Sequence, residues 1–171
     1  MALTYQAIAT VTVGSGGAAN IEFTSIPGTY TDLLVKVCAR TDVSANNRTT
    51  INFKFNNSTS SQSMRTLFGY DSSTVESATY TDLRLSVPAA GATASTFGNA
   101  ELYVPNYAGS NNKSVSVDSV NENNSSTAWL IGLWAGLWSN SAAITSITFT
   151  PASGNFAQYS TATLFGIKNT V

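Results

Sequence analysis

Short runs in which apolar and polar residues alternate recur along almost the whole chain, and this period of two limits the possible folds more than any other feature. Successive side chains of a β-strand point to opposite faces of a sheet, so the alternation predicts strands with one buried face. In residues 32–40, the side chains predicted to point inward are Leu33, Val35, Val37 and Ala39. Those predicted to point outward are Asp32, Lys36, Cys38 and Arg40.

The same pattern predicts further strands in the runs 4–13, 20–26, 51–55, 64–70, 82–87, 100–104, 114–120, 128–138, 144–150 and 161–167. Turn residues separate these runs, and Pro27-Gly28 predicts a type II turn in which Gly28 has a positive φ. Weak helical periodicity near 72–79 and 89–96 lies in stretches too rich in Ser, Gly and Thr for stable helices. We therefore predict an all-β fold for residues 1–171, a single antiparallel two-sheet β-sandwich that is jelly-roll-like.

The composition excludes several partner classes. The chain has 171 residues, of which only 10% are charged, and its formal net charge is −1. Because a phosphate backbone or an anionic membrane attracts basic surfaces, we expect neither nucleic acid nor a membrane as partner. The opening residues 1–17 lack a basic start and a continuous apolar run, so we expect no signal peptide there.

The chain has little catalytic equipment. It contains no histidine, which excludes Ser-His and Cys-His nucleophile systems and removes the commonest zinc ligand. The single Cys38 cannot form an intrachain disulfide, and we interpret it as a small side chain that fills space on a strand. We therefore expect no enzyme activity, no cofactor and no metal site.

Carboxylates at Glu101, Asp118 and Glu122 are close enough in sequence to be considered as a glycoside-hydrolase pair, but surface pairing or solvation explains them better. Residues 118–124 offer oxygen ligands without the glycine and terminal glutamate of an EF-hand loop, which leaves calcium binding open. Gly14, Gly16 and Gly17 match no phosphate-binding fingerprint and are interpreted as turn residues.

The run AWLIGLWAGLW, residues 128–138, is apolar on both faces of the predicted strand. One interpretation is a central strand that is covered on both sides. The other is that the face with Leu130, Trp134 and Trp138 points away from the core and packs against another subunit, because tryptophan often anchors interfaces. We take the second interpretation and predict these residues as a subunit interface.

Four stretches, 23–40, 100–124, 135–156 and 159–168, together resemble a family of small proteins and terminal domains encoded by tailed bacteriophages, especially those of cyanobacteria and other aquatic bacteria. The resemblance covers most of the chain in order. It implies a virion structural protein and carries no catalytic residues.

Two roles follow from this resemblance. The first is a capsid decoration, or cement, protein on the capsid exterior, a homotrimer that binds the major capsid protein and stabilises the head. The alternative is a receptor-binding module of a tail fibre or tail tip, with a carbohydrate-binding or carbohydrate-active domain as a third reading. The chain begins at its first predicted strand without a preceding shaft, so we expect decoration.

Overall fold

The computed structural model describes residues 4–70, 74–124 and 129–168, and these contain strands and no helix. The strands are β1 (Tyr5–Thr12), β2 (Ile21–Phe23), β3 (Asp32–Ala39), β4 (Arg48–Phe55), β5 (Gln62–Tyr70), β6 (Thr74–Tyr80), β7 (Leu83–Pro88), β8 (Gly98–Val104), β9 (Lys113–Asn121), β10 (Leu130–Trp138), β11 (Ile147–Pro151) and β12 (Thr161–Ile167). No helix in the described residues is long and apolar enough to cross a membrane.

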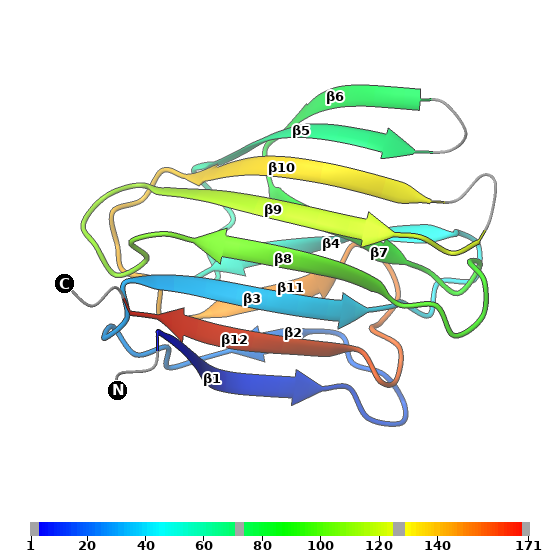
Figure 1. Ribbon diagram of the computed structural model, residues 1–171, viewed down its shortest axis with the longest axis horizontal. Helices are drawn as coiled ribbons and strands as arrows, with labels where there is room; N and C mark the ends of the chain where they lie inside the picture. The colour runs from blue at the N-terminus through cyan, green and yellow to red at the C-terminus, as the bar shows by residue number, and fades with distance from the viewer. Residues whose placement is uncertain (1–3, 71–73, 125–128, 169–171) are drawn as a thin grey trace.

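The strands form two antiparallel sheets that face each other (Figure 1). The larger sheet has eight strands in the order β1-β12-β3-β8-β9-β10-β5-β6, and the smaller has four in the order β2-β11-β4-β7. The predicted two-sheet sandwich is therefore confirmed.

Eight strands follow the order of a jelly roll, with β1, β12, β3 and β8 adjacent in one sheet and β2, β11, β4 and β7 in the other. The remaining strands are two insertions, β5 with β6 and β9 with β10. The insertions meet because β10 pairs with β5 along its whole length, and they continue the larger sheet beyond β8. We call these four strands the extension.

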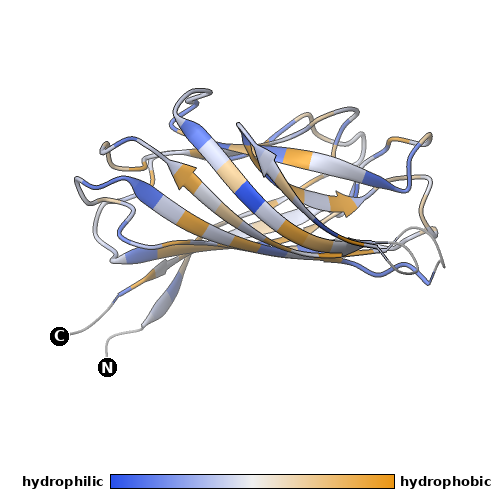
Figure 2. Cartoon of the chain, turned by 90° about the horizontal axis from the view of Figure 1, so that it is seen from above, coloured by the Kyte–Doolittle hydropathy of each residue, from blue (hydrophilic) through white to orange (hydrophobic). Residues whose placement is uncertain are grey.

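Alternating side chains build the core between the sheets, and Figure 2 shows the corresponding alternation of apolar and polar segments along several strands. The predicted inward residues of β3 are all buried, as are Ile51, Phe53 and Phe55 of β4. The Phe53 ring lies 5.7 Å from the ring of Phe55 and 5.9 Å from that of Phe149 in β11. The aromatic core thus joins neighbouring strands of the smaller sheet.

Two residues predicted to point into solvent from β3 are buried instead. Asp32 accepts hydrogen bonds from the Tyr103 hydroxyl at 2.9 Å and from the Asn106 backbone N–H at 2.9 Å. Arg40, just after the strand, is enclosed by the connection between β7 and β8. The prediction is wrong here because loops cover the strand ends, whereas Lys36 and Cys38 in the middle are exposed.

Two local predictions also differ from the structure. In the stretch near 72–79 we expect from the sequence no stable helix and no strand, but its described residues 74–79 belong to the edge strand β6, which pairs with β5; residues 72–73 lie outside the described residues. Residues 28–29 form a turn, but Gly28 is not among the residues with positive φ, so the type II assignment is wrong. The turn at Gly14 to Gly17 is confirmed, with φ of 112° at Gly16 and 76° at Gly17.

Candidate interaction surface

The prediction that Leu130, Trp134 and Trp138 point away from the core is wrong, because each is at most 5% exposed and belongs to the hydrophobic core. The Trp138 ring lies 5.7 Å from the ring of Phe55 in the smaller sheet. These side chains fill the space between the sheets, so they are not on a surface that a partner subunit reaches.

Glycines explain why the tryptophan face of β10 is the inner one. A Cβ atom at Gly132 would lie 2.4 Å from the Trp134 ring, and one at Gly136 would lie 2.8 Å from Leu83 of the opposing sheet. Large rings therefore fit on this face only because small residues alternate with them. The alternation of Trp with Gly on one face of β10 follows from this packing, and its meaning becomes clear only in the folded structure.

The opposite face of β10 is apolar and exposed. Ile131 and Leu133 are 58% and 62% exposed, and Leu67 of β5 and Val75 of β6 are 54% and 73% exposed. Leu133 pairs with Leu67, while Gly69 of β5 lies between Ile131 and Val75. Single exposed apolar side chains are ordinary, whereas a contiguous cluster marks an interaction site.

Trp129 completes this cluster, because atoms of its ring lie 3.7 Å and 4.0 Å from the position of a Cβ at Gly69. We call Leu67, Val75, Trp129, Ile131 and Leu133 the apolar patch. It lies on the outer face of the extension, across β10, β5 and β6.

The apolar patch is hollowed at two places. One hollow of about 280 Å³ lies among its own residues, and a second of about 580 Å³ lies beside Leu67 and Leu133. Asp118 and Arg65 border the second hollow. The surface thus combines an apolar centre with charged residues at its margin, as protein interfaces do.

The extension also ends in an open strand edge. β6 is seven residues long, pairs with β5 without a register shift, and contains no proline or lysine. Exposed edges of this kind are ready to pair with another strand, and natural proteins commonly block them. The edge of β6 carries one exposed charged residue, Glu76, and none of the other blocking devices.

The other sheet edges are protected. β1 has a register irregularity between Ala7 and Ala9, and β2 has only three residues. At the edge of β7, backbone groups form hydrogen bonds with side chains of the larger sheet. The backbone N–H of Arg84 donates to Met64 Sδ at 3.4 Å, and the Ser119 hydroxyl donates to the Ser86 carbonyl at 2.6 Å. β6 is therefore the edge that stands out within the described strands.

The carboxylates considered for catalysis lie on the exposed side of the larger sheet. Glu101 pairs in register with Asp118 and forms an ion pair with Lys36 at 3.0 Å. Glu122 follows β9 and accepts a hydrogen bond from the Asn124 N–H at 2.6 Å. The described residues contain no group of three or more Asp, Glu, His or Cys that could hold a metal ion.

The stretch considered for calcium is largely not a loop, because Asp118 to Asn121 belong to β9. The Asn121 side chain points inward and bonds to the Ser86 hydroxyl at 3.0 Å. Cys38 is an exposed free thiol on β3. These positions are thus surface or packing positions of the sheet.

Sequence reasoning missed the role of Arg40. Its guanidinium donates to the backbone carbonyls of Ala90, Ala92, Thr93 and Thr96 at 2.8–3.2 Å. Burial lowers the pKa of Arg40 from its ordinary value. A single buried side chain therefore holds the connection between β7 and β8.

Comparisons with known proteins identify no family. No family model matches the sequence, and no curated protein is significantly similar to it. Among solved structures, the crystal structure of infectious bursal disease virus VP2 subviral particle aligns with 95% of this chain and 40% of that chain, at 12% identity and a TM-score of 0.12. A TM-score that low carries no argument about fold or function.

Proposed function

We propose that this chain is a structural protein of a bacteriophage virion, a capsid decoration protein that binds the major capsid protein on the outside of the head. The phage family that four stretches of the sequence resemble suggests the setting. The observation that carries the proposal is the exposed apolar patch, since a rigid sandwich that exposes such a cluster is suited to binding another protein.

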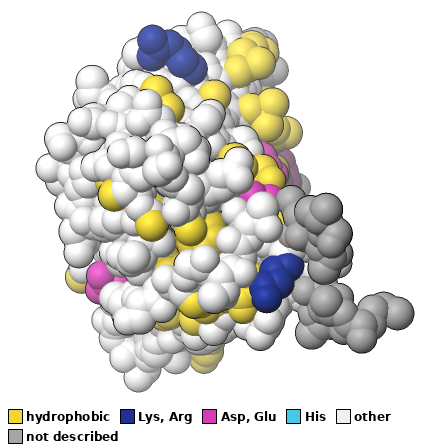
Figure 3. All heavy atoms as spheres, turned by 90° about the vertical axis from the view of Figure 1, so that its left-hand side faces the viewer, with side chains coloured by type: hydrophobic (Ala, Val, Ile, Leu, Met, Phe, Trp, Pro, Cys, Tyr) yellow, Lys and Arg dark blue, Asp and Glu magenta, His cyan; other side chains and the backbone are white. Residues whose placement is uncertain are grey.

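The surface chemistry also suits assembly. On the side of the molecule drawn in Figure 3, few side chains carry charge and most of the surface is uncharged. Such a surface can lie against neighbouring proteins with little cost of desolvating ions. In the proposed homotrimer, three chains sit around a threefold position of the capsid and each presents its apolar patch to the shell.

The copy number of the chain in purified particles tests the proposal. Quantitative mass spectrometry against the major capsid protein is expected to find hundreds of copies per particle. A handful of copies would place the chain in the tail as a receptor-binding module. Absence from particles would reject a virion role altogether.

Variants test the surface itself. We predict that Ile131→Ser with Leu133→Ser leaves the fold intact, because both side chains are exposed, and reduces binding to capsids that lack the chain. Interface anchors typically contribute about 2 kcal/mol or more, so binding should fall by roughly thirtyfold or more in a co-sedimentation assay.

Tyr5→Ser is the matched control, since Tyr5 is also exposed but lies on β1 at the far edge of the larger sheet. It is expected to bind like the unmodified chain. Equal capsid binding by the double variant and the control would show that the apolar patch is not the attachment surface.

A further inference from the structure

A second concave site lies on the other side of the extension. The larger sheet curves past the edge of β7, so side chains from its inner face reach over the outer face of β4 and β7. Between them is a cleft of about 230 Å³. The cleft is lined by Arg48, Thr50 and Arg84 from the smaller sheet and by Phe68, Tyr80 and Trp134 from the extension, among others.

Arg48 supplies an uncommitted positive charge to this cleft. Its guanidinium carbon lies 4.7 Å from the centre of the Tyr70 ring, a cation–π contact that fixes the side chain. Among the described residues, Arg48 makes no ion pair and no side-chain hydrogen bond. Its hydrogen-bond donors are therefore available to a ligand.

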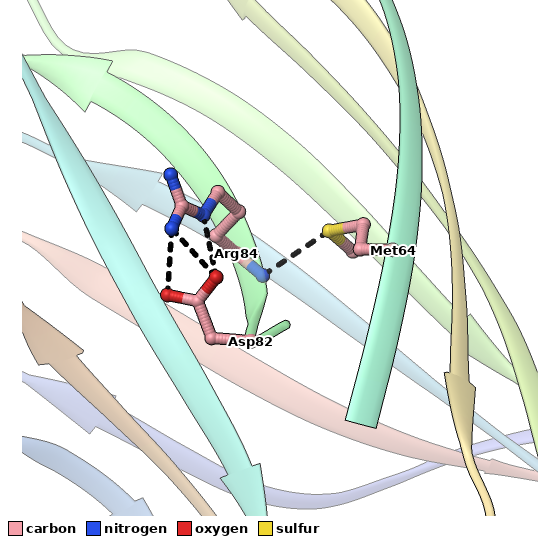
Figure 4. A network of polar contacts seen from close by, with 3 residues as sticks. All are labelled: Met64, Asp82 and Arg84. Carbon is pink, nitrogen blue, oxygen red and sulfur yellow. Dashed lines mark hydrogen bonds and ion pairs between the residues drawn. The ribbon is translucent and has the colours of Figure 1, made fainter. Parts of the chain in front are cut away.

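Arg84 lines the cleft, and its side chain is held in place by Asp82. Figure 4 shows the contacts of Arg84 with Asp82 and Met64. Its Nε and Nη2 atoms donate to the Asp82 carboxylate at 2.6–3.0 Å, and its guanidinium carbon lies 3.7 Å from the centre of the Tyr80 ring. Asp82 neutralises Arg84, so the charge that remains in the cleft is that of Arg48. Glu76, which accepts a hydrogen bond from the Tyr70 hydroxyl at 2.8 Å, does not line the cleft.

We propose that this cleft binds a small molecule in which a ring carries a carboxylate. A guanidinium presents donors in a planar fork that matches a carboxylate, which assigns the carboxylate to Arg48. The aromatic side chains of Phe68 and Tyr80 offer flat surfaces for the ring, and the hydroxyl of Thr50 offers a polar contact.

The size of the cleft limits the ligand to about one ring. Its 230 Å³ is smaller than the roughly 300–1,000 Å³ of pockets for drug-sized molecules. A carboxylated ring can come from two sources, a uronic acid unit of an acidic polysaccharide or a free aromatic acid. This inference does not depend on the proposed virion role, because it concerns a different face and a free ligand.

Titration of the purified full-length chain with D-glucuronate, benzoate and D-glucose tests the proposal, with isothermal calorimetry and the fluorescence of the tryptophans as readouts. We expect saturable binding of at least one carboxylate and none of glucose. Tighter binding of glucuronate would identify the saccharide source, and tighter binding of benzoate the aromatic one.

Arg48→Met removes the charge and keeps the length of the side chain, so it should weaken binding by about tenfold or more. Arg48→Lys keeps the charge without the planar fork and should give an intermediate affinity. The control is Arg65→Met, which removes an exposed arginine from the outer face of β5 and should leave binding unchanged.

Three results would overturn the proposal. The first is that the unmodified chain binds neither carboxylate. The second is that it binds glucose as tightly as a carboxylate. The third is that Arg48→Met and Arg65→Met bind the carboxylate with the same affinity. If Arg48→Met fails to fold, which circular dichroism would reveal, the unmodified chain and Arg48→Lys decide the outcome. Capsid binding is measured separately, so failure here leaves the virion proposal to its own test.

Discussion

At the scale of single residues, Arg40 stabilises the connection between β7 and β8. Replacing Arg40 by alanine removes four hydrogen bonds to backbone carbonyls of residues 90–96, of which the bond to Ala92 is buried and the other three are half-buried. Hydrogen bonds to charged groups are strong, and unsatisfied buried acceptors are costly. We predict that Arg40→Ala lowers the free energy of unfolding by about 3 kcal/mol, measured by urea denaturation.

Lys36→Ala is the control on the same strand, because Lys36 pairs with Glu101 at an exposed position. Exposed ion pairs contribute about 1 kcal/mol or less, so this variant should be nearly as stable as the unmodified chain. Similar losses in both variants would mean that the carbonyl contacts of Arg40 do not stabilise the fold.

At the scale of elements, β6 is the strand whose edge is open. Lysines block edge pairing because their charge cannot be buried between two strands. We predict that Ser77→Lys with Thr79→Lys lowers self-association of the chain at high concentration, measured by sedimentation velocity over a concentration series. Both positions are exposed, so the substitutions should not unfold the chain.

Gln6→Lys places a lysine on β1 at the opposite edge of the same sheet, where a register irregularity already disturbs pairing. This control should associate like the unmodified chain. The prediction fails if the unmodified chain is monomeric throughout the series, or if the edge lysines of β6 leave its association unchanged.

At the scale of the whole molecule, the jelly roll and the extension differ in how they are covered. β3, β8 and β12 each have a paired strand on both sides in the larger sheet, whereas β6 contacts chiefly β5. Local stability follows packing. We predict that backbone amides of β6 exchange with deuterium at least roughly tenfold faster than those of β3, β8 and β12.

Hydrogen exchange followed by mass spectrometry distinguishes these strands by their peptides. Uniform protection across all of them would mean that the extension unfolds only together with the jelly roll. If β6 alone becomes more protected at high protein concentration, its edge pairs with another chain, which is the same pairing that the lysine variants of β6 test.

The sequence by itself determined the fold class and the inner residues of most strands. Alternation in β3, β4 and β7 identifies Val35, Phe53 and Leu85 as core, because in a half-buried strand the neighbours in the chain already separate inside from outside. The turn at Gly16 and Gly17 was equally local, since a positive φ favours glycine.

Tertiary structure decided which face of β10 is outside. Both faces of β10 are apolar, so the alternation of apolar and polar residues does not distinguish them. Only the fit of Trp134 over Gly132 and of Trp138 against Phe55 determined which face is buried. The apolar patch and the cleft also could not be predicted from the sequence. Each joins strands from two insertions that are distant in the chain, and nothing local in either insertion specifies that β5 pairs with β10.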